Sequence, residues 1–449
     1  MDIIISGNEK IMSFLYRMHP HWKEKLQSGV EIRKELATLS GTQGGRKPSA
    51  FNYHVEHDGR HMVYNAMYNT LVRMTKMEYE KLLGLRPCGK ELAKLYLTHG
   101  IAVPEDLDER QCYEVWRGMQ EEQVRYLSLN ITTTLKCNAR CAYCYEKGVV
   151  QQDFQESMLP KLIGFIKRKK KKSQVRLNWF GGEPLMNPSL LDAVARELTA
   201  AKIDFNSYLI TNGSLLTKKM VREKFPQWHM QDVQVSLDGM PEEYEVRKAY
   251  VGKRRNVFQK LMEQVAVMAE HKIRVHIRLN IDSENRASIL QLMEILHQQV
   301  DALEYVTYYP AFLTGNANKL TEEEKVAFLK EMFHLLHDPE KMSMGNRMYA
   351  MPRPYPCMRN DPGSYSVDIH GNVYNCEHLV GRSEKAMGTL LRMKPGETAR
   401  RSEIIFQEEC DTCPFLPKCM GGCAANFETQ DAPCMIEKYM IQAYVEMLA

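Results

Sequence analysis

The chain has 449 residues, of which 44% are hydrophobic and 26% charged, and a formal net charge of +4. This length accommodates two or three domains, and the nearly balanced charge indicates no nucleic-acid partner. The segment Met1–Gly7 lacks a signal-peptide pattern, and no run of about 18 apolar residues predicts a membrane span. We therefore expect a cytoplasmic protein without a membrane partner, whose twelve cysteines bind metal rather than form disulfides.

The first 120 residues predict a small sheet followed by short helices. Asp58-Gly59 is a hairpin signal between two strand-like runs, and Thr75 and Glu78 have the spacing of a capping box that starts a helix. The strand-like runs are Phe51–Glu56, a stretch through Val63 and Tyr64, and Tyr68–Met74, and further helices are expected near 89–98 and 107–120. We assign residues 1–120 to an N-terminal module, with helical stretches and a polar linker inside residues 1–50.

From residue 121 onward, strand patterns alternate with amphipathic helices. Leu191, Val194 and Leu198 share one helix face, and the residues between Ile289 and Leu296 repeat at the same spacing. Six such β-α units predict a parallel sheet with crossover helices. The expected strands are Val124–Thr132, Val175–Phe180, Phe205–Thr211, Val233–Leu237, Val275–Ile281 and Leu303–Tyr309.

These strands alternate between apolar and polar residues, as Val275–Ile281 illustrates. Parallel strands that are covered on both faces are instead nearly continuous apolar runs. One face therefore meets the helices, while the other is polar. This pattern favours an α/β fold with a partial (β/α)6 TIM-like barrel over residues 121–318, whose polar lumen holds a polar ligand.

Marked sequences lie at the carboxyl ends of the expected strands, where the chemistry of such barrels is located. Three cysteines with C-x3-C-x2-C spacing follow the first strand. Their thiolates could bind three irons of a four-iron cluster and leave the fourth iron open, although zinc is an alternative. The later strand ends carry Gly181-Gly182-Glu183-Pro184, Thr211-Asn-Gly, Ser236-Leu-Asp-Gly, and the pair Arg278 and Asn280.

Seven further cysteines lie near the C-terminus. Four of them, with C-x2-C-x5-C-x3-C spacing, could form a zinc ribbon, which would leave the other three unexplained. The seven are Cys357, Cys376, Cys410, Cys413, Cys419, Cys423 and Cys434. The remaining two cysteines of the chain, Cys88 and Cys112, are expected to be packing residues.

The motif Cys137-x3-Cys141-x2-Cys144, with Tyr143 before its last cysteine, resembles the radical S-adenosylmethionine (SAM) superfamily. The C-terminal cysteine spacing resembles the SPASM extension of peptide-modifying members, with residues 357–449 as the iron–sulfur domain and 319–356 as a helical linker. The N-terminal module weakly resembles a winged-helix element that binds a leader peptide as an added strand, and a packing extension of the core is the alternative.

The resemblance implies SAM and three [4Fe-4S] clusters, one of them at Cys137, Cys141 and Cys144. Gly181, Gly182 and Glu183 would hold the methionyl amino group, and Arg247 would pair with the carboxylate. Ser236 would contact the ribose or carboxylate, Arg278 or Asn280 the ribose, and Tyr143 the adenine. Thr211 would also line the cofactor site.

The family pattern further implies two auxiliary clusters. Cys410, Cys413, Cys419 and Cys434 would hold the distal one, and Cys357, Cys376 and Cys423 the proximal one. Some relatives have an eighth cysteine about six residues after the first, and this chain has none there. The proximal cluster would therefore keep an open iron, for a substrate thiolate, water or a group such as His378.

The function implied is that of a peptide maturase that cleaves SAM to a 5′-deoxyadenosyl radical and installs a cross-link, with a thioether favoured. Its substrate would be a cysteine-containing precursor peptide with a leader, and its reducing partner a flavodoxin or ferredoxin. The alternatives are a formylglycine-forming sulfatase maturase or another protein-residue oxidase, and a non-catalytic iron–sulfur or zinc protein that binds a peptide.

Overall fold

The computed structural model describes residues 1–5, 45–121, 126–144, 146, 148, 150–170, 173–252, 256–313, 320–336, 355, 357–394, 408–423 and 434–449. The helical stretches expected before residue 45 and most of the expected linker 319–356 lie outside these residues. No helix in the described part of the chain is long and apolar enough to cross a membrane.

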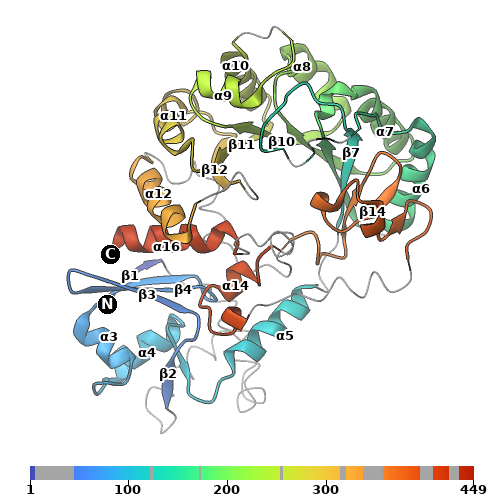
Figure 1. The fold of residues 1–449 in the computed structure, drawn as a ribbon. Coiled ribbons are helices and arrows are strands. Elements are labelled where there is room, and N and C mark those ends of the chain that lie inside the picture. Colours follow the sequence, from blue (N-terminus) through green and yellow to red (C-terminus); the bar gives the residue numbers. More distant parts are fainter. Residues whose placement is uncertain are drawn as a thin grey trace.

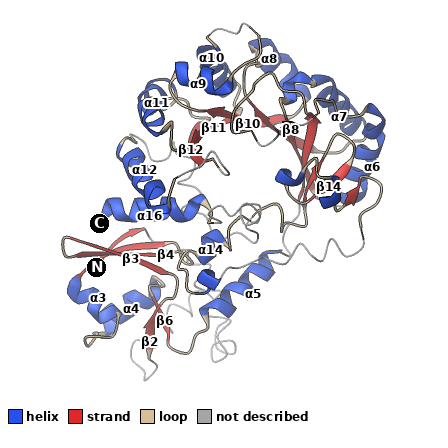
Figure 2. Cartoon of the chain, in the orientation of Figure 1, coloured by secondary structure: helices blue, strands red, loops and turns tan. Residues whose placement is uncertain are grey.

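A nine-stranded, mostly parallel sheet forms the centre of the fold, with the strand order β12-β11-β10-β9-β8-β7-β13-β14-β15 (Figure 2). Six consecutive strands, from β12 at one edge of the sheet to β7, lie within three residues of the expected bounds, and the α/β prediction with a partial barrel is confirmed. These six strands are β7 (Tyr126–Thr134), β8 (Gln174–Gly181), β9 (Phe205–Thr211), β10 (Met230–Leu237), β11 (Arg274–Ile281) and β12 (Val306–Phe312).

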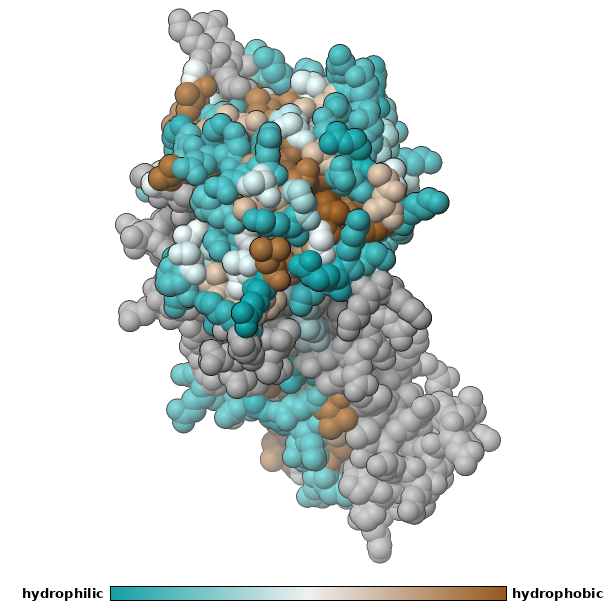
Figure 3. All heavy atoms as spheres, turned by 90° about the vertical axis from the view of Figure 1, so that its right-hand side faces the viewer, coloured by the Kyte–Doolittle hydropathy of each residue, from teal (hydrophilic) through white to brown (hydrophobic). Residues whose placement is uncertain are grey.

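Helices cover the outer face of this curved sheet (Figure 1). The expected helix faces are buried, since Leu191, Val194, Leu198, Ile289 and Leu296 are all fully inaccessible. The helices are α6 (Leu159–Lys170), α7 (Pro188–Ala200), α8 (Lys218–Gln227), α9 (Pro241–Lys248), α10 (Val257–Glu270), α11 (Arg286–Gln299) and α12 (Glu322–His334), with short 3₁₀ turns at Glu156–Met158 and Pro184–Met186. Figure 3 shows that the side of the molecule that carries α6 and α7 is mainly hydrophilic.

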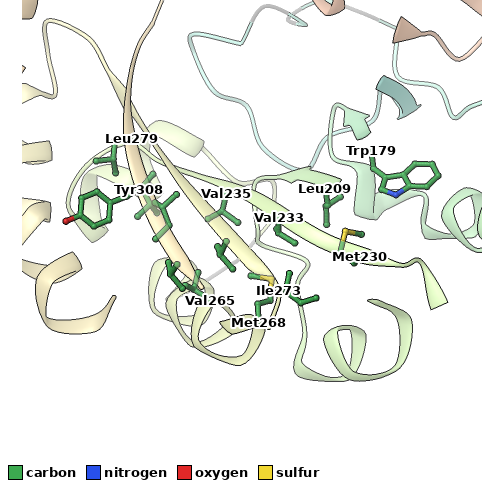
Figure 4. Close-up of a cluster of buried hydrophobic side chains, with 14 of the residues drawn as sticks. Trp179, Leu209, Met230, Val233, Val235, Val265, Met268, Ile273, Leu279 and Tyr308 are labelled. Carbon is green, nitrogen blue, oxygen red and sulfur yellow. The ribbon is translucent and has the colours of Figure 1, made fainter. Parts of the chain in front are cut away.

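The alternation in the strands separates an apolar face from a polar one. Figure 4 shows Val233 and Val235 of β10 among the buried side chains that include Val265 and Met268 of α10. The apolar face is therefore the side of the sheet on which the helices pack.

The opposite face carries a network of polar side chains. The Asn178 amide donates to Ser128 Oγ and Asn130 Oδ1, at 2.9 and 2.8 Å. The Tyr208 and Tyr309 hydroxyls both donate to Gln234 Oε1, at 2.9 and 2.6 Å. The lumen is therefore polar, as the strand pattern predicts.

The N-terminal module is an antiparallel sheet with helices on one side. The capping box is present: Glu78 N donates to Thr75 Oγ1 at 3.3 Å, and Thr75 N to Glu78 Oε2 at 2.9 Å. Asp58 and Gly59 both have positive φ, at 50° and 72°, as a tight hairpin turn requires. The module contains β1 (Asp2–Ile5), β3 (Asn52–His57), β4 (Arg60–Asn65), β5 (Thr70–Thr75), the pair β2 (Arg46–Pro48) and β6 (Ala102–Pro104), α3 (Lys76–Leu82), α4 (Lys90–Thr98) and α5 (Glu109–Glu121).

The C-terminal part is continuous with the barrel. Strand β13 (Ser364–Val367) pairs in parallel with β7, and β14 (Asn372–Tyr374) and β15 (Gly388–Thr389) extend the sheet. Helix α16 (Ile436–Leu448) contacts both α12 and β4, and so lies between the barrel and the N-terminal sheet (Figure 1). The remaining elements are α14 (Leu416–Cys419) and 3₁₀ turns at Glu377–Leu379, Ser383–Lys385 and Glu408–Asp411.

Candidate active site

The loop with Cys137, Cys141 and Cys144 follows β7 at its carboxyl end. Its backbone is fixed by local bonds, since Cys144 N donates to Cys141 O at 3.2 Å and Arg140 N donates to Lys248 O at 2.9 Å. Burial raises the pKa of the Cys137 thiol, and it raises that of Cys144 to about 11. A bound metal would reverse this effect, because a coordinating thiol loses its proton. Three thiols in one anchored loop therefore fit an iron–sulfur cluster.

Gly181 and Gly182 support this loop from the end of β8. A Cβ atom on Gly182 would lie 2.4 Å from the carbonyl oxygen of Lys136, and one on Gly181 would lie 2.3 Å from that of Thr134. The close approach allows Gly182 N to donate to Thr134 O and Glu183 N to donate to Lys136 O, both at 2.9 Å. Because the two glycines have no side chains, the backbone of β8 can approach the backbone of Thr134–Lys136 closely. This approach fixes the position at which the cysteine loop begins.

The Glu183 carboxylate is fully buried and joins the ends of β8 and β9. Its Oε1 accepts from Thr211 Oγ1 at 2.8 Å and from Leu185 N at 3.0 Å, and its Oε2 accepts from Asn212 N at 2.8 Å. Burial raises the pKa of Glu183 despite these donors. Glu183 and Thr211, both expected near the cofactor, therefore contact each other and build the strand ends.

A second polar network lies beside the cysteine loop. The Tyr143 hydroxyl donates to Asp238 Oδ1 at 2.7 Å, and the Asn280 amide donates to the same oxygen at 2.8 Å. Lys248 Nζ donates to Ser236 Oγ at 2.7 Å and to Tyr143 at 3.0 Å, and it forms an ion pair with Asp238 at 2.9 Å. The structure thus brings together three of the expected residues, Tyr143, Ser236 and Asn280.

Lys248 and Asp238 were missed as site residues by sequence reasoning, although Asp238 lies inside the Ser236-Leu-Asp-Gly motif. Lys248 directly follows Arg247 on α9, and nothing in the local pattern shows which of the two cations is buried. In the structure the Lys248 side chain is 3% exposed. A charge that is so deeply buried requires a partner, and Asp238 provides it.

The two arginines expected at the cofactor differ in their environment. Arg247 donates to Asp282 and also lies near Glu243 and Glu284, so its charge is already balanced. Arg278 pairs in register with Ser236 on β10 and with Tyr309 on β12. The Nε atoms of both arginines are buried without a hydrogen-bond partner among the described residues, but only Arg247 forms ion pairs there. Arg278 is therefore the better placed of the two to receive an anion.

The C-terminal cysteines interact in two sets. Burial raises the pKa of Cys376 to about 12, and the nearby charges of Cys357 and Cys423 contribute to this increase. In the second set, Cys419 donates a hydrogen bond to Cys434, and Cys413 lies near both Cys434 and Cys410. The first set contains Cys357, Cys376 and Cys423, and the second contains Cys410, Cys413, Cys419 and Cys434. In the described ranges, no three His, Cys, Asp or Glu side chains lie close enough together to bind one metal ion.

The proximal set lies next to the barrel lumen. The Asn130 amide of β7 donates to Glu377 Oε2 at 2.8 Å, and Glu377 directly follows Cys376. Glu146, two residues after Cys144, lies close enough to Glu377 that burial and this carboxylate raise its pKa to about 7. The two cysteine regions, more than 200 residues apart in the chain, therefore meet at one edge of the lumen.

Residues 131–296 match the family model of the radical SAM superfamily. These residues form a radical SAM domain, and the chain is an enzyme.

Individual relatives are more distant. The chain is 22% identical over 231 residues to a GTP 3′,8-cyclase of Helicobacter pylori (strain HPAG1), a match that covers 51% of this chain and 70% of the cyclase. It is 20% identical over 350 residues to a cysteine-type anaerobic sulfatase-maturating enzyme of Clostridium perfringens (strain 13 / Type A), covering 69% of this chain and 92% of that enzyme.

A solved structure shares the fold of this chain. The native anSMEcpe structure with bound AdoMet has a TM-score of 0.55 and 17% identity, with 72% of this chain and 96% of that chain covered. Streptococcus suis SuiB bound to the precursor peptide SuiA has a TM-score of 0.47 and 15% identity, with 87% and 98% covered.

The glycine contact leads to a first prediction. We expect Gly182→Ala to destabilise the chain by about 1–3 kcal/mol, because the new methyl group meets the Lys136 carbonyl oxygen. The free energy of unfolding measures this cost, and iron per chain reports on the cysteine loop. Gly164→Ala on helix α6 is the matched control, since its methyl group meets only the flexible Arg168 side chain and alanine favours a helix. Equal stability of the two variants would contradict the assignment.

Proposed function

We propose that this chain is a peptide-modifying maturase with one SAM-binding cluster and two auxiliary clusters. Cys137, Cys141 and Cys144 would hold the first cluster, and Cys357, Cys376 and Cys423 the proximal cluster. The distal cluster would be held by Cys410, Cys413, Cys419 and Cys434. When bound, SAM and its cluster supply a carbon radical that abstracts hydrogen from an unactivated C–H bond. The contact of Asn130 with Glu377 carries the proposal, because it supports a substrate position between the first and the proximal clusters.

The chain's own residues would bind and orient SAM. Tyr143, Ser236 and Lys248 form a preorganised polar wall beside the cysteine loop, and Asn280 completes it. The backbone at Gly181 and Gly182 would face the amino group, while Glu183 holds this backbone in place. Arg278 takes the carboxylate in preference to Arg247, whose guanidinium is already bound to Asp282.

A peptide substrate is supported by the fold similarity, because anSMEcpe, which shares the barrel, has been solved with AdoMet and a Cp18Cys peptide at a TM-score of 0.53. The proximal set has three cysteines, so one iron of its cluster would stay open to a substrate thiolate. Attachment of that sulfur to a substrate carbon would give a thioether. The cross-link removes two hydrogens from the peptide: the radical derived from SAM would take one as a hydrogen atom, and the thiol would lose the other as a proton. The electron left over would pass to the auxiliary clusters, and a flavodoxin or ferredoxin would supply the electron that cleaves SAM.

The N-terminal module is a candidate for leader recognition. β3 is the outer strand in the described part of its sheet, and an extended peptide could pair with its free edge.

The second candidate function is sulfatase maturation, which the similarity to the C. perfringens enzyme favours. The sequence Cys357-Met-Arg-Asn-Asp-Pro-Gly-Ser has no second cysteine after Cys357, and this absence argues against sulfatase maturation.

The radical site is tested by Cys137→Ala. We expect this variant to lose SAM cleavage and to keep about eight of about twelve irons per chain, because each cubane holds four. The measurements are 5′-deoxyadenosine release and iron content after anaerobic reconstitution. Cys88→Ala is the control, because Cys88 lies in the N-terminal module. A variant that retains SAM cleavage would refute the assignment.

The choice between the arginines is tested by SAM affinity. Arg278→Ala should weaken SAM binding by about tenfold or more, the value of one charge-assisted hydrogen bond, and Arg278→Lys should lose less. Arg274→Ala is the matched control on the same strand face, because Arg274 is paired with Asp232. Equilibrium binding by calorimetry gives the comparison. Equal losses of SAM affinity for Arg278→Ala and Arg274→Ala would show that Arg278 does not bind the SAM carboxylate.

The reaction is tested by co-expression with a short cysteine-rich peptide encoded beside this gene. We expect mass spectrometry to show a loss of two hydrogens per cross-link, and fragmentation to locate a sulfur–carbon bond. An unmodified peptide in an anaerobic assay supplied with SAM would count against cross-linking. Oxidation of a cysteine to formylglycine in a sulfatase peptide would establish the second candidate instead.

A further inference from the structure

The distal cysteine segment, residues 408–420, completes the hydrophobic core of the N-terminal module. Leu416 and Met420 are buried in the same cluster as Val63, Val72 and Tyr113, and Cys410 packs against this cluster. Met420 is fully inaccessible, and Leu416 is 2% exposed. The other buried members of this cluster come from residues 51–113. Part of the core of the N-terminal module is therefore formed by a segment some 300 residues later in the chain.

Polar contacts reinforce this shared core. Lys418, which is 6% exposed, donates to Asn69 Oδ1 at 3.2 Å. Arg110 of α5 donates to Asp411 at 2.6 Å, and the Tyr53 ring of β3 lies 4.8 Å from that of Phe415. These contacts reach residues on both sides of Cys413, so the segment cannot rearrange without loss of contacts in the module.

Two further features connect the module to the distal cysteines. Tyr113 of α5 has a buried hydroxyl with no hydrogen-bond partner among the described residues, and it lies near Cys419. A buried unpaired donor is costly, and a cluster sulfur at the distal set would relieve that cost. Helix α16 begins two residues after Cys434, and its Glu446 accepts from the Tyr53 hydroxyl at 3.1 Å.

We propose that loading of the distal cysteine set with its cluster stabilises the N-terminal module. The inference rests on the proposed assignment of Cys410, Cys413, Cys419 and Cys434 to one cluster. A cluster that binds the folded arrangement of these cysteines fixes segment 408–420, and the module then gains its complete core. In a chain without the distal cluster, the N-terminal module is less stable. Only chains that already hold this cluster therefore bind the peptide substrate through the module.

The experiment compares amide hydrogen exchange in β4 and β5 of the reconstituted full chain with that of Cys413→Ala. Cys413 packs against a different core cluster from the one that holds Leu416 and Met420, so its replacement removes none of the side-chain contacts within that second cluster. Cys357→Ala, which removes a proximal ligand, is the matched control. We expect β4 and β5 to exchange about tenfold faster in Cys413→Ala and at the wild-type rate in Cys357→Ala, since only the loss of the distal cluster frees segment 408–420 from the core of the module.

Iron content separates failure of the inference from failure of the cluster assignment. If Cys413→Ala loses about four irons and β4 and β5 exchange at the wild-type rate, the coupling is refuted while the cluster stands. If Cys413→Ala keeps its full iron content, the assignment and the coupling both fail. A second measurement excludes misfolding of the variant as the cause. Wild-type chain from which iron has been removed should exchange amide hydrogens faster in β4 and β5. Reconstitution with iron should restore the slow exchange. Protection that does not return would overturn the proposal.

Discussion

The contact between two backbones, at Gly181-Gly182 and Thr134–Lys136, governs the rest of the site. It places the last residue of β7 and the residues that directly follow it against the end of β8, and so sets where the cysteine loop begins. Glu183 then bonds to the end of β9, which continues the connection around the barrel. A side chain at either glycine would separate these strand ends. The position of the cysteine loop therefore depends on glycine at both residues.

Much of the fold follows from local patterns in the sequence. The strands β7 to β12 were predicted because apolar and polar residues alternate in them, and the helix at Lys76 because Thr75 and Glu78 cap it. Each of these signals acts between neighbouring residues, so no knowledge of distant parts of the chain is needed. The cysteine groups were likewise visible from spacing.

The individual roles of charged residues could not be predicted in this way. Arg247 and Lys248 are adjacent in the sequence, yet Lys248 is buried against Asp238 while Arg247 pairs with Asp282 beyond the end of β11. The outcome depends on how α9 is rotated against the sheet, which is a property of tertiary packing. For the same reason, no local pattern indicates that Leu416 and Met420 belong to the core of the N-terminal module.

The parallel pairing of β13 with β7 has a consequence for electron transfer. Ser364, Tyr365, Ser366 and Val367 are held in register with Ser128–Ile131, so backbone hydrogen bonds connect the barrel to the C-terminal cysteine region. Domains joined by side chains alone can slide or hinge, whereas a shared sheet resists both movements. The shared sheet, rather than side-chain contacts on the outer surface, therefore sets the distance between the two cysteine regions, across which any clusters bound there would exchange electrons.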